Sequence, residues 1–347
     1  MRAVVVKEFA GSPAVQVVPD PVPPPGGVTV QVGVTGLCRS DWHGWMGHDP
    51  DIVLPHVPGD EFAGTIAAVG SGVRNWRAGD RVTTPFVCAC GQCAACAAGD
   101  QQVCERQSQP GFTHWGSFAE YVVVQHAEVN LVRLPDELPE TVAAALGCRF
   151  ATAYRAVVDQ GGVRPGEWVA IQGCGGVGLS AIMIAAAAGG RVVAVDISES
   201  ALDLARRCGA EICLTAAPGD PDEVAQIVRE VTGGGAHLSL DALGSPATCA
   251  ASVLSLRRRG RHVQVGLLPA ALAAPALPMD RVIAYELAVL GSHGMPAHAY
   301  PRLLALIAAG TLDPSLLITG TLTLDQTPAA LAEMDRFAHP GIRLIQP

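Results

Sequence analysis

Four cysteines near residue 100 lie close enough in sequence to bind one metal ion. Cys90, Cys93, Cys96 and Cys104 follow the pattern C-x2-C-x2-C-x7-C. A tetrahedral Zn²⁺ accepts four thiolates at about 2.3 Å, and such a closed set leaves no position for a substrate. The spacing therefore predicts a structural zinc site in a lobe spanning about residues 88–106, with disulfides as the alternative.

A glycine-rich run, GCGGVG at residues 173–178, is typical of a dinucleotide-binding turn. It follows an apolar, strand-like segment and opens an apolar, helix-like one. We expect the first glycine to allow the tight turn, the second to let a pyrophosphate approach, and the last to let helix and strand pack closely. The helix N-terminus would also offer free N–H groups to the phosphates. The predicted cofactor contacts are Gly173, Gly175, Gly176, Val177 and Gly178.

An acidic residue, Asp196, follows this turn at the end of the next predicted strand. Its carboxylate should accept hydrogen bonds from the adenosine ribose and repel a 2′-phosphate. No Lys or Arg follows in residues 197–200, so the sequence favours NAD(H) over NADP(H). The alternative is that Asp196 caps the following helix, but Ser198 is better placed for that.

The surrounding chain, 347 residues long, suits two domains of an α/β fold. Residues 1–150 read as short β segments broken by Gly and Pro, which predicts an irregular antiparallel barrel. Strands and helices alternate from about residue 151 to 295, which predicts a doubly wound parallel sheet. Residues 296–347 begin with a helix, Pro301–Gly310, and are expected to return to the first domain.

Composition argues against nucleic-acid and membrane partners. The net charge is −9, and we interpret the one arginine cluster, Arg257–Arg261, as a helix end turning into a strand. The most apolar stretch, Ala181–Gly190, is too short to span a bilayer. Eleven cysteines without a signal peptide indicate a reducing, cytoplasmic environment.

Three further motifs establish a family resemblance: GLCRSDWH at residues 36–43, PGDEFAG at 58–64 and LGCRFATAY at 146–154. With the cysteine lobe and the glycine turn, they resemble the zinc-dependent medium-chain alcohol dehydrogenases along the whole chain. The resemblance implies a GroES-like catalytic domain, residues 1–150 and 296–347, around a Rossmann NAD-binding domain, residues 151–295. It also implies two zinc ions per chain, an alcohol or aldehyde substrate, and a homodimer or homotetramer formed partly through the edge of the cofactor-domain sheet.

Residue roles follow from the resemblance by position. Cys38 and Cys148 would be thiolate ligands of a catalytic zinc, and Ser40 and His43 would carry the substrate proton to solvent. Arg39 would bind the pyrophosphate, Thr152 would lie against the nicotinamide, and Arg343 would reach a phosphate or the nearby glutamate. The chemistry is consistent, because a metal stabilises an alkoxide-like oxygen and a hydroxyl–imidazole chain removes its proton. The alternatives are two buried cysteines and an ordinary histidine.

The chain departs from the family where a Gly-His-Glu motif is usual and Gly59, Asp60 and Glu61 stand instead. We expect Asp60 to take the place of the histidine ligand, since a carboxylate can bind zinc. Glu61 could bind intermittently or replace it, and an empty site is the remaining alternative. Two thiolates and a carboxylate give a centre of charge −1, so alkoxide formation should require a higher pH than in histidine-bearing relatives. Asp41, which orients that histidine in the family, should have another partner, a backbone N–H or an arginine.

The substrate is the least determined feature. Trp42, Trp45, Phe86, Phe112 and Trp115 gather in the first domain and together favour an apolar or aromatic alcohol, although for any single one of them ordinary core packing is the better explanation. Two other functions compete: a zinc-free enoyl or quinone reductase, and a non-catalytic nucleotide-binding protein on the same fold. Cys38, Cys148 and Ser40 argue against the first, and Ser40 with His43 against the second.

Overall fold

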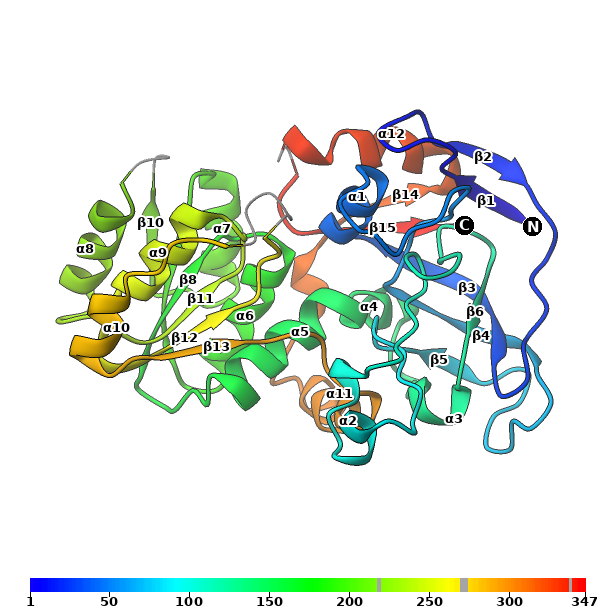
Figure 1. Ribbon diagram of the computed structural model, residues 1–347, viewed down its shortest axis with the longest axis horizontal. Helices are drawn as coiled ribbons and strands as arrows, with labels where there is room; N and C mark the ends of the chain where they lie inside the picture. Colours follow the sequence, from blue (N-terminus) through cyan, green and yellow to red (C-terminus); the bar gives the residue numbers. More distant parts are fainter. Residues whose placement is uncertain (217–219, 269–273, 337–338) are drawn as a thin grey trace. The chain divides into compact units, whose positions relative to one another are not determined.

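The computed structural model describes residues 1–216, 220–268, 274–336 and 339–347. The chain divides into two compact units, each drawn in Figure 1. The first unit contains Met1–Ala151, Gly294–Ala309 and Ile318–Pro347, and the second contains Thr152–His293 and Gly310–Leu317. The α/β fold class is confirmed, whereas the boundaries proposed for the functional domains stay a prediction. Among the helices of the described ranges, none has the length and apolarity needed to cross a membrane.

The first unit is built on a seven-stranded mixed sheet in the order β14-β15-β3-β4-β5-β7, with β6 also pairing β3. Its strands are β3 (Val28–Leu37), β4 (Phe62–Val69), β5 (Arg81–Thr83), β6 (Tyr121–Val124), β7 (Val132–Arg133), β14 (Ile318–Thr323) and β15 (Ile342–Gln346). Among the described residues, every pair in this sheet is antiparallel except β14 with β15. The antiparallel pairing predicted within residues 1–150 is therefore confirmed, and the parallel pair joins the two C-terminal strands. A separate hairpin pairs β1 (Arg2–Val5) with β2 (Ala14–Val17).

Strand β3 shows why this segment is extended and central. Its valines at 28, 30, 32 and 34 are buried, and the first three pack in a core cluster with Phe62 and Ile66 of β4. β-branched side chains at alternate positions suit a pleated, half-buried surface. The strand ends directly before helix α1, and this junction carries the first residues of the candidate site.

Short helices complete the first unit. They are α1 (Arg39–Trp45), α2 (Ala94–Ala97), α3 (Ala127–Asn130), α4 (Glu140–Ala144), α11 (Tyr300–Ala308) and α12 (Thr327–Ala332), with a π-helical turn at Leu146–Phe150. Helix α5 (Ala151–Tyr154) follows that turn and leads into a second π-helical segment, Arg155–Gln160.

The second unit is a six-stranded parallel sheet in the order β10-β9-β8-β11-β12-β13. The strands are β8 (Trp168–Gln172), β9 (Arg191–Asp196), β10 (Ile212–Thr215), β11 (Ala236–Asp241), β12 (Leu256–Gln264) and β13 (Ala288–Gly291). Strand order reverses between β8 and β11, as in dinucleotide-binding doubly wound sheets. The predicted alternation is therefore confirmed.

Helices α6 (Gly176–Ala187), α7 (Glu199–Arg207), α8 (Pro221–Val231), α9 (Pro246–Leu254) and α10 (Met279–Tyr285) connect or flank these strands. Two details differ from expectation. Residues 257–261 lie within strand β12 and do not end a helix, because β12 already begins at Leu256. Helix α10 had no counterpart in the sequence interpretation, and it has no buried residue whose periodicity would reveal it.

Candidate active site

Cys38 lies where β3 ends and α1 begins. It is the N-cap residue of α1, and its backbone N–H donates to Asp41 Oδ2 over 2.8 Å. The side chain is 4 % exposed. Cys38 and Asp41 form a capping box, in which the Asp41 side chain satisfies the free backbone N–H of Cys38. This interaction fixes the position of Cys38 between the strand and the helix.

Cys148 lies on the π-helical turn Leu146–Phe150. A π-helical turn widens the backbone by one residue and is frequent at functional sites. A hydrogen bond with Cys38 and burial raise the pKa of the Cys148 thiol well above its usual value. Two cysteines from distant parts of the sequence are therefore in contact.

Asp60 completes a group of three possible metal ligands with these two cysteines. The donor atoms of Cys38, Asp60 and Cys148 all lie within 4.8 Å of one another. Asp60 is fully buried, and its Oδ1 has no hydrogen-bond partner. A buried carboxylate oxygen without a donor is costly, so this atom indicates that a cation belongs here.

Two sulfur atoms and one oxygen fit zinc with one position left open, the arrangement of a catalytic site. Burial raises the pKa of the Asp60 carboxyl well above its usual value, and the charges of Asp41 and Glu61 raise it further, against Arg149 and Gln109. Both raised pKa values favour the protonated forms of Asp60 and Cys148 when no cation is near, so metal binding here is coupled to proton release.

Glu61 lies outside the ligand group, although the sequence interpretation allowed it to bind the metal. Its carboxylate forms a buried ion pair with Arg149 and also accepts from the backbone N–H groups of Cys148 and Arg149 at 3.1 and 2.8 Å. Arg149 further donates to the carbonyl of Leu37 over 3.0 Å. Glu61 therefore links β4, β3 and the turn that carries Cys148.

Asp41 is re-paired, as expected, and its partners are backbone N–H groups. Besides capping Cys38, it accepts from Gly59 N over 2.8 Å. Burial raises the pKa of the Asp41 carboxyl well above its usual value, and these two donors oppose the shift. The carboxylate thus ties together the two segments that carry Cys38 and Asp60.

Ser40 and His43 lie on α1. The Ser40 hydroxyl contacts Asp60 Oδ2 at 3.4 Å, so it lies at the ligand group. His43 Nδ1 faces Nδ1 of His48 at 2.9 Å, and both rings stack edge-on against Trp42. Burial, with Arg39 and His48, lowers the pKa of His43 to about 4, so the imidazole is neutral near pH 7.

The four-cysteine lobe forms the second group of possible metal ligands. Cys93 Sγ lies 3.4 Å from Cys96 Sγ and 3.7 Å from Cys104 Sγ. A tetrahedron with arms of about 2.3 Å has edges of about 3.8 Å. All eleven cysteines are free, so the disulfide alternative is wrong. Backbone N–H groups of Cys90 and Arg106 point at Cys104 Sγ at 3.2 and 3.4 Å, as donors that support a metal-bound thiolate do.

The apolar core of this lobe consists largely of the cysteines themselves, with Ala89 and the partly buried Ala95 and Val129. Such a small core leaves the metal to stabilise the fold of the lobe. We therefore expect Cys96→Ala to reduce zinc from two ions to one per chain and to increase protease cleavage within residues 88–106 by at least about tenfold. Metal analysis and limited proteolysis measure both effects. The neighbouring Cys88→Ser is the control, and unchanged zinc and cleavage in Cys96→Ala would contradict the assignment.

The glycine turn has the geometry of a dinucleotide-binding loop. Gly173 has φ +90°, and a Cβ on Gly178 would meet the Gly173 carbonyl oxygen at 1.8 Å. Around Gly175 a Cβ would meet nothing within 4 Å, and Gly176 and Val177 begin α6. The turn is thus open on the side where a pyrophosphate would approach the helix N-terminus.

Asp196 ends β9 and accepts from Cys174 N at 2.6 Å and from Ser198 N at 2.8 Å. Each carboxylate oxygen keeps a lone pair for a further donor. Ser198 is the N-cap of α7, as expected, and accepts from Ala201 N. Asp196 is therefore available for a ribose hydroxyl.

Of the other predicted cofactor residues, the two arginines have partners within the protein, whereas Thr152 has none for its hydroxyl. Arg39 stacks over Trp42 and donates to the carbonyl of Met334, while Arg343 donates to the carbonyl of Ala330 over 3.2 Å. Both arginines thus contact carbonyls at or just beyond α12, where cations are favourable. Thr152 is 7 % exposed and its hydroxyl has no hydrogen-bond partner.

The aromatic residues differ among themselves. Trp42 and Trp45 pack against the core cluster that contains Leu37 and Phe118, so the packing explanation holds for them. Phe86 and Phe112 are buried, and Trp115 is 36 % exposed.

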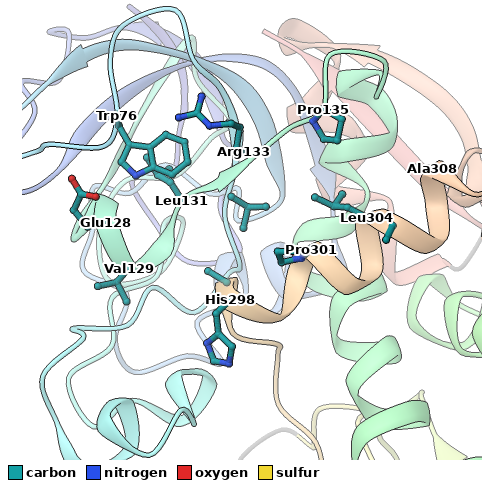
Figure 2. Close-up of a pocket in the computed structure, with 13 residues that line it drawn as sticks. Trp76, Glu128, Val129, Leu131, Arg133, Pro135, His298, Pro301, Leu304 and Ala308 are labelled. Carbon is teal, nitrogen blue, oxygen red and sulfur yellow. The ribbon is translucent and has the colours of Figure 1, made fainter.

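A cavity of about 600 Å³ in the first unit is lined by none of the predicted site residues (Figure 2). Its apolar lining includes Leu131, Pro301, Leu304 and Ala308. Its polar side chains already have partners, in the pairs Glu128–Asn75, Arg133–Asp80 and His298–Gln101. Without converging polar groups it lacks the means to orient a ligand, and we assign no substrate to it.

Comparison with known proteins agrees with this geometry. Residues 24–136 match the alcohol dehydrogenase GroES-like domain, and residues 176–309 match the zinc-binding dehydrogenase family. An alcohol dehydrogenase of Geobacillus stearothermophilus is 38 % identical over 277 residues, which are 79 % of this chain and 80 % of that protein. The chain belongs to the zinc-binding alcohol dehydrogenase family.

Full-length relatives support the same conclusion. An NAD-dependent alcohol dehydrogenase of Sulfurisphaera tokodaii is 30 % identical over 100 % of both chains. The structure of alcohol dehydrogenase TADH from Thermus sp. ATN1 has a TM-score of 0.89 and 33 % identity, covering 100 % of this chain and 99 % of that one. The predicted family, the zinc-dependent oxidation of CH–OH groups and the use of NAD are confirmed for this dehydrogenase.

Three residues of the dehydrogenase's site escaped the sequence interpretation: Arg149, Gln109 and His48. A charged residue directly after Cys148 in an apolar run was a usable signal for Arg149. Gln109, which contacts Asp60 from a distant part of the sequence, and His48, which follows His43 closely, carried no such signal.

Proposed function

We propose that the protein oxidises apolar or aromatic alcohols, and reduces the corresponding aldehydes, at a zinc held by Cys38, Asp60 and Cys148. The observation that carries the ligand set is the unpartnered, buried Oδ1 of Asp60 within reach of both thiols. The apolar substrate class is supported by Phe112 and Trp115, which belong to the same chain segment as Gln109, the residue that contacts Asp60.

Steady-state kinetics with benzyl alcohol, a linear alcohol and a polyol tests the substrate class. Apolar pocket contacts discriminate by roughly 10–200-fold, so kcat/KM for benzyl alcohol should exceed that for the polyol by at least tenfold. A preference for the polyol would reject the apolar substrate class while leaving the zinc chemistry in place.

In the proposed mechanism zinc, when bound, supplies the Lewis acidity that lets an alcohol lose its proton, and NAD supplies the hydride acceptor. Ser40 receives the hydroxyl proton of the substrate, because its Oγ already lies at the ligand group. Asp41 and Glu61 are positioning residues. Asp41 holds the backbone N–H groups of Cys38 and Gly59, and Glu61 holds that of Cys148.

In this relay Ser40 gives up its own hydroxyl proton to Nε2 of His43, and His43 releases its Nδ1 proton to Nδ1 of His48, which is exposed. With its pKa lowered to about 4, His43 stays a competent acceptor down to that pH. We expect His43→Gln to lower kcat about 100-fold at pH 7 and less at alkaline pH, where solvent accepts the proton more readily. His48→Gln should show a smaller loss that added imidazole buffer restores. Identical pH–rate profiles of the three proteins would reject the relay.

We propose that Asp196 binds the adenosine ribose and that Gly173–Gly178, Arg39, Thr152 and Arg343 complete the NAD site. Hydrogen bonds to a charged group are worth about 1.5–3 kcal/mol, so Asp196→Ser should lower kcat/KM for NAD about 10–100-fold and raise that for NADP. Cofactor kinetics with both nucleotides measures this. An unchanged preference for NAD would show that other residues exclude the 2′-phosphate.

We propose that the enzyme is a homodimer or homotetramer whose copies meet at β13. This strand ends the sheet order, and Val289 within it and Ile283 and Met279 of the adjoining helix are 39, 73 and 52 % exposed. An apolar edge strand is a template for pairing with another chain. Sedimentation velocity tests the assembly, and a monomer at micromolar concentration would reject it.

We propose a cytoplasmic location, which eleven free cysteines support.

A further inference from the structure

The two oxygens of Asp60 have different surroundings. Oδ2 accepts from Gln109 Nε2 at 3.2 Å and lies 3.4 Å from the Ser40 hydroxyl, whereas Oδ1 is buried without a partner. A carboxylate presents two equivalent oxygens to a metal unless a donor distinguishes them. In Asp60 both donors, Gln109 and Ser40, contact Oδ2, and the side-chain amide of Gln109 is the nearer of the two.

The segment that carries Gln109 is anchored to the backbone that carries Asp60. Gly116 N and Ser117 N donate to Val57 and Gly59 carbonyls at 2.7 and 3.0 Å. A Cβ on Gly111 or Gly116 would come within 2.7 or 2.2 Å of the Gly59 backbone. Such close approach requires glycine at these positions and fixes the two segments against each other.

Gln109 itself is held by a tight turn. Its N–H donates to Thr113 Oγ1 at 2.8 Å, and its carbonyl accepts from the N–H groups of Phe112 and Thr113 at 3.1 and 3.0 Å. The amide is therefore delivered to Asp60 by a rigid support, as effective positioning of a metal ligand requires.

The neighbouring acids are already engaged. Asp41 has an N–H group on each oxygen, and Glu61 is paired with Arg149. Of these three buried carboxylates, Asp60 alone has an oxygen without a hydrogen-bond partner.

We propose that Gln109 is a positioning residue for the catalytic metal, which holds Oδ2 of Asp60 so that Oδ1 is the oxygen left for the ion. The inference rests on the proposed ligand set of Cys38, Asp60 and Cys148. Metal ligands are generally oriented by a hydrogen-bond partner in the protein. Here that partner is the side-chain amide of Gln109, and the ligand that it orients is Asp60.

The test replaces Gln109 by Met, which is similar in length and lacks a donor, and by Asn, which keeps the amide but is one methylene too short. The control is Gln107→Met, an exposed glutamine of the same segment. Zinc affinity is measured by competition with a chromophoric chelator, and the cobalt-substituted proteins are compared by visible absorption. The second metal ion, in the four-cysteine lobe, reports that each variant is folded.

Loss of a partner that orients a ligand typically costs 10–100-fold in metal affinity. We expect both Gln109 variants to lose that much at the catalytic site and to change the cobalt d–d bands, while Gln107→Met retains both properties. Wild-type affinity and spectrum in folded Gln109→Met or Gln109→Asn would overturn the proposal. Asp60→Asn distinguishes the two levels of the argument. If Asp60→Asn and the Gln109 variants all bind metal as the wild type does, Asp60 is not a ligand and the ligand set is wrong. If Asp60→Asn loses metal affinity while the Gln109 variants keep it, only the role of Gln109 is rejected.

Discussion

An Asp60→Ala variant is expected to contain one zinc ion per chain and to oxidise alcohols at least about 1000-fold more slowly than the wild type. Removing the carboxylate leaves two thiols, Cys38 and Cys148, which are too few to hold a catalytic zinc with its usual three protein ligands. The Lewis acidity lost with the ion is worth several kcal/mol of transition-state stabilisation, and about 4 kcal/mol corresponds to 1000-fold. Metal analysis and kcat/KM measure the two effects.

Asp60→His is the matched variant, because it restores the ligand usual in the family. It should retain two zinc ions and shift the pH profile of alcohol oxidation toward lower pH, since the centre changes from a formal −1 to zero. A wild-type profile no more alkaline than that of Asp60→His would contradict the charge argument. Retention of both ions and activity in Asp60→Ala would show that Asp60 is no ligand.

An Arg149→Met variant is expected to lose about 3–5 kcal/mol of stability. Arg149 and Glu61 have side chains that are 7 and 0 % exposed, so removing the cation leaves a buried, unpaired carboxylate. The same change removes the donor to Leu37 and loosens the turn of Cys148, so weaker zinc binding should accompany the loss. Thermal unfolding of the zinc-loaded protein, with zinc content, measures both.

Arg2→Met is the control, because its partner Asp325 and Arg2 itself are 67 and 43 % exposed and such a surface pair contributes at most about 1 kcal/mol. The double variant Arg149→Met with Glu61→Gln should recover part of the loss, since no unpaired charge remains. Equal stability of Arg149→Met and Arg2→Met would refute the role of the buried pair.

Two motifs are local in sequence and could be predicted from their spacing: the four-cysteine zinc motif and the glycine-rich NAD motif. The four cysteines lie between positions 90 and 104 and the glycine turn between positions 173 and 178, so ligand geometry and backbone conformation restrict each of them directly. The parallel sheet was predictable for a similar reason, because the alternation of strands and helices repeats along the chain and allows few topologies.

The catalytic group required the family resemblance, because Cys38 and Cys148 lie far apart in the sequence and no local period relates them. Only the tertiary structure decided what the acids beside it do. Sequence offered Asp60 and Glu61 as adjacent candidates, and they differ in role because Arg149, from a distant segment, pairs with Glu61 and leaves Asp60 Oδ1 unpartnered. The contact of Gln109 with Asp60 likewise depends on tertiary structure, because the loop that carries Gln109 packs closely against Gly59. Contacts between distant segments depend on how the sheet and its loops pack, and a buried charge takes whichever partner that packing brings within reach.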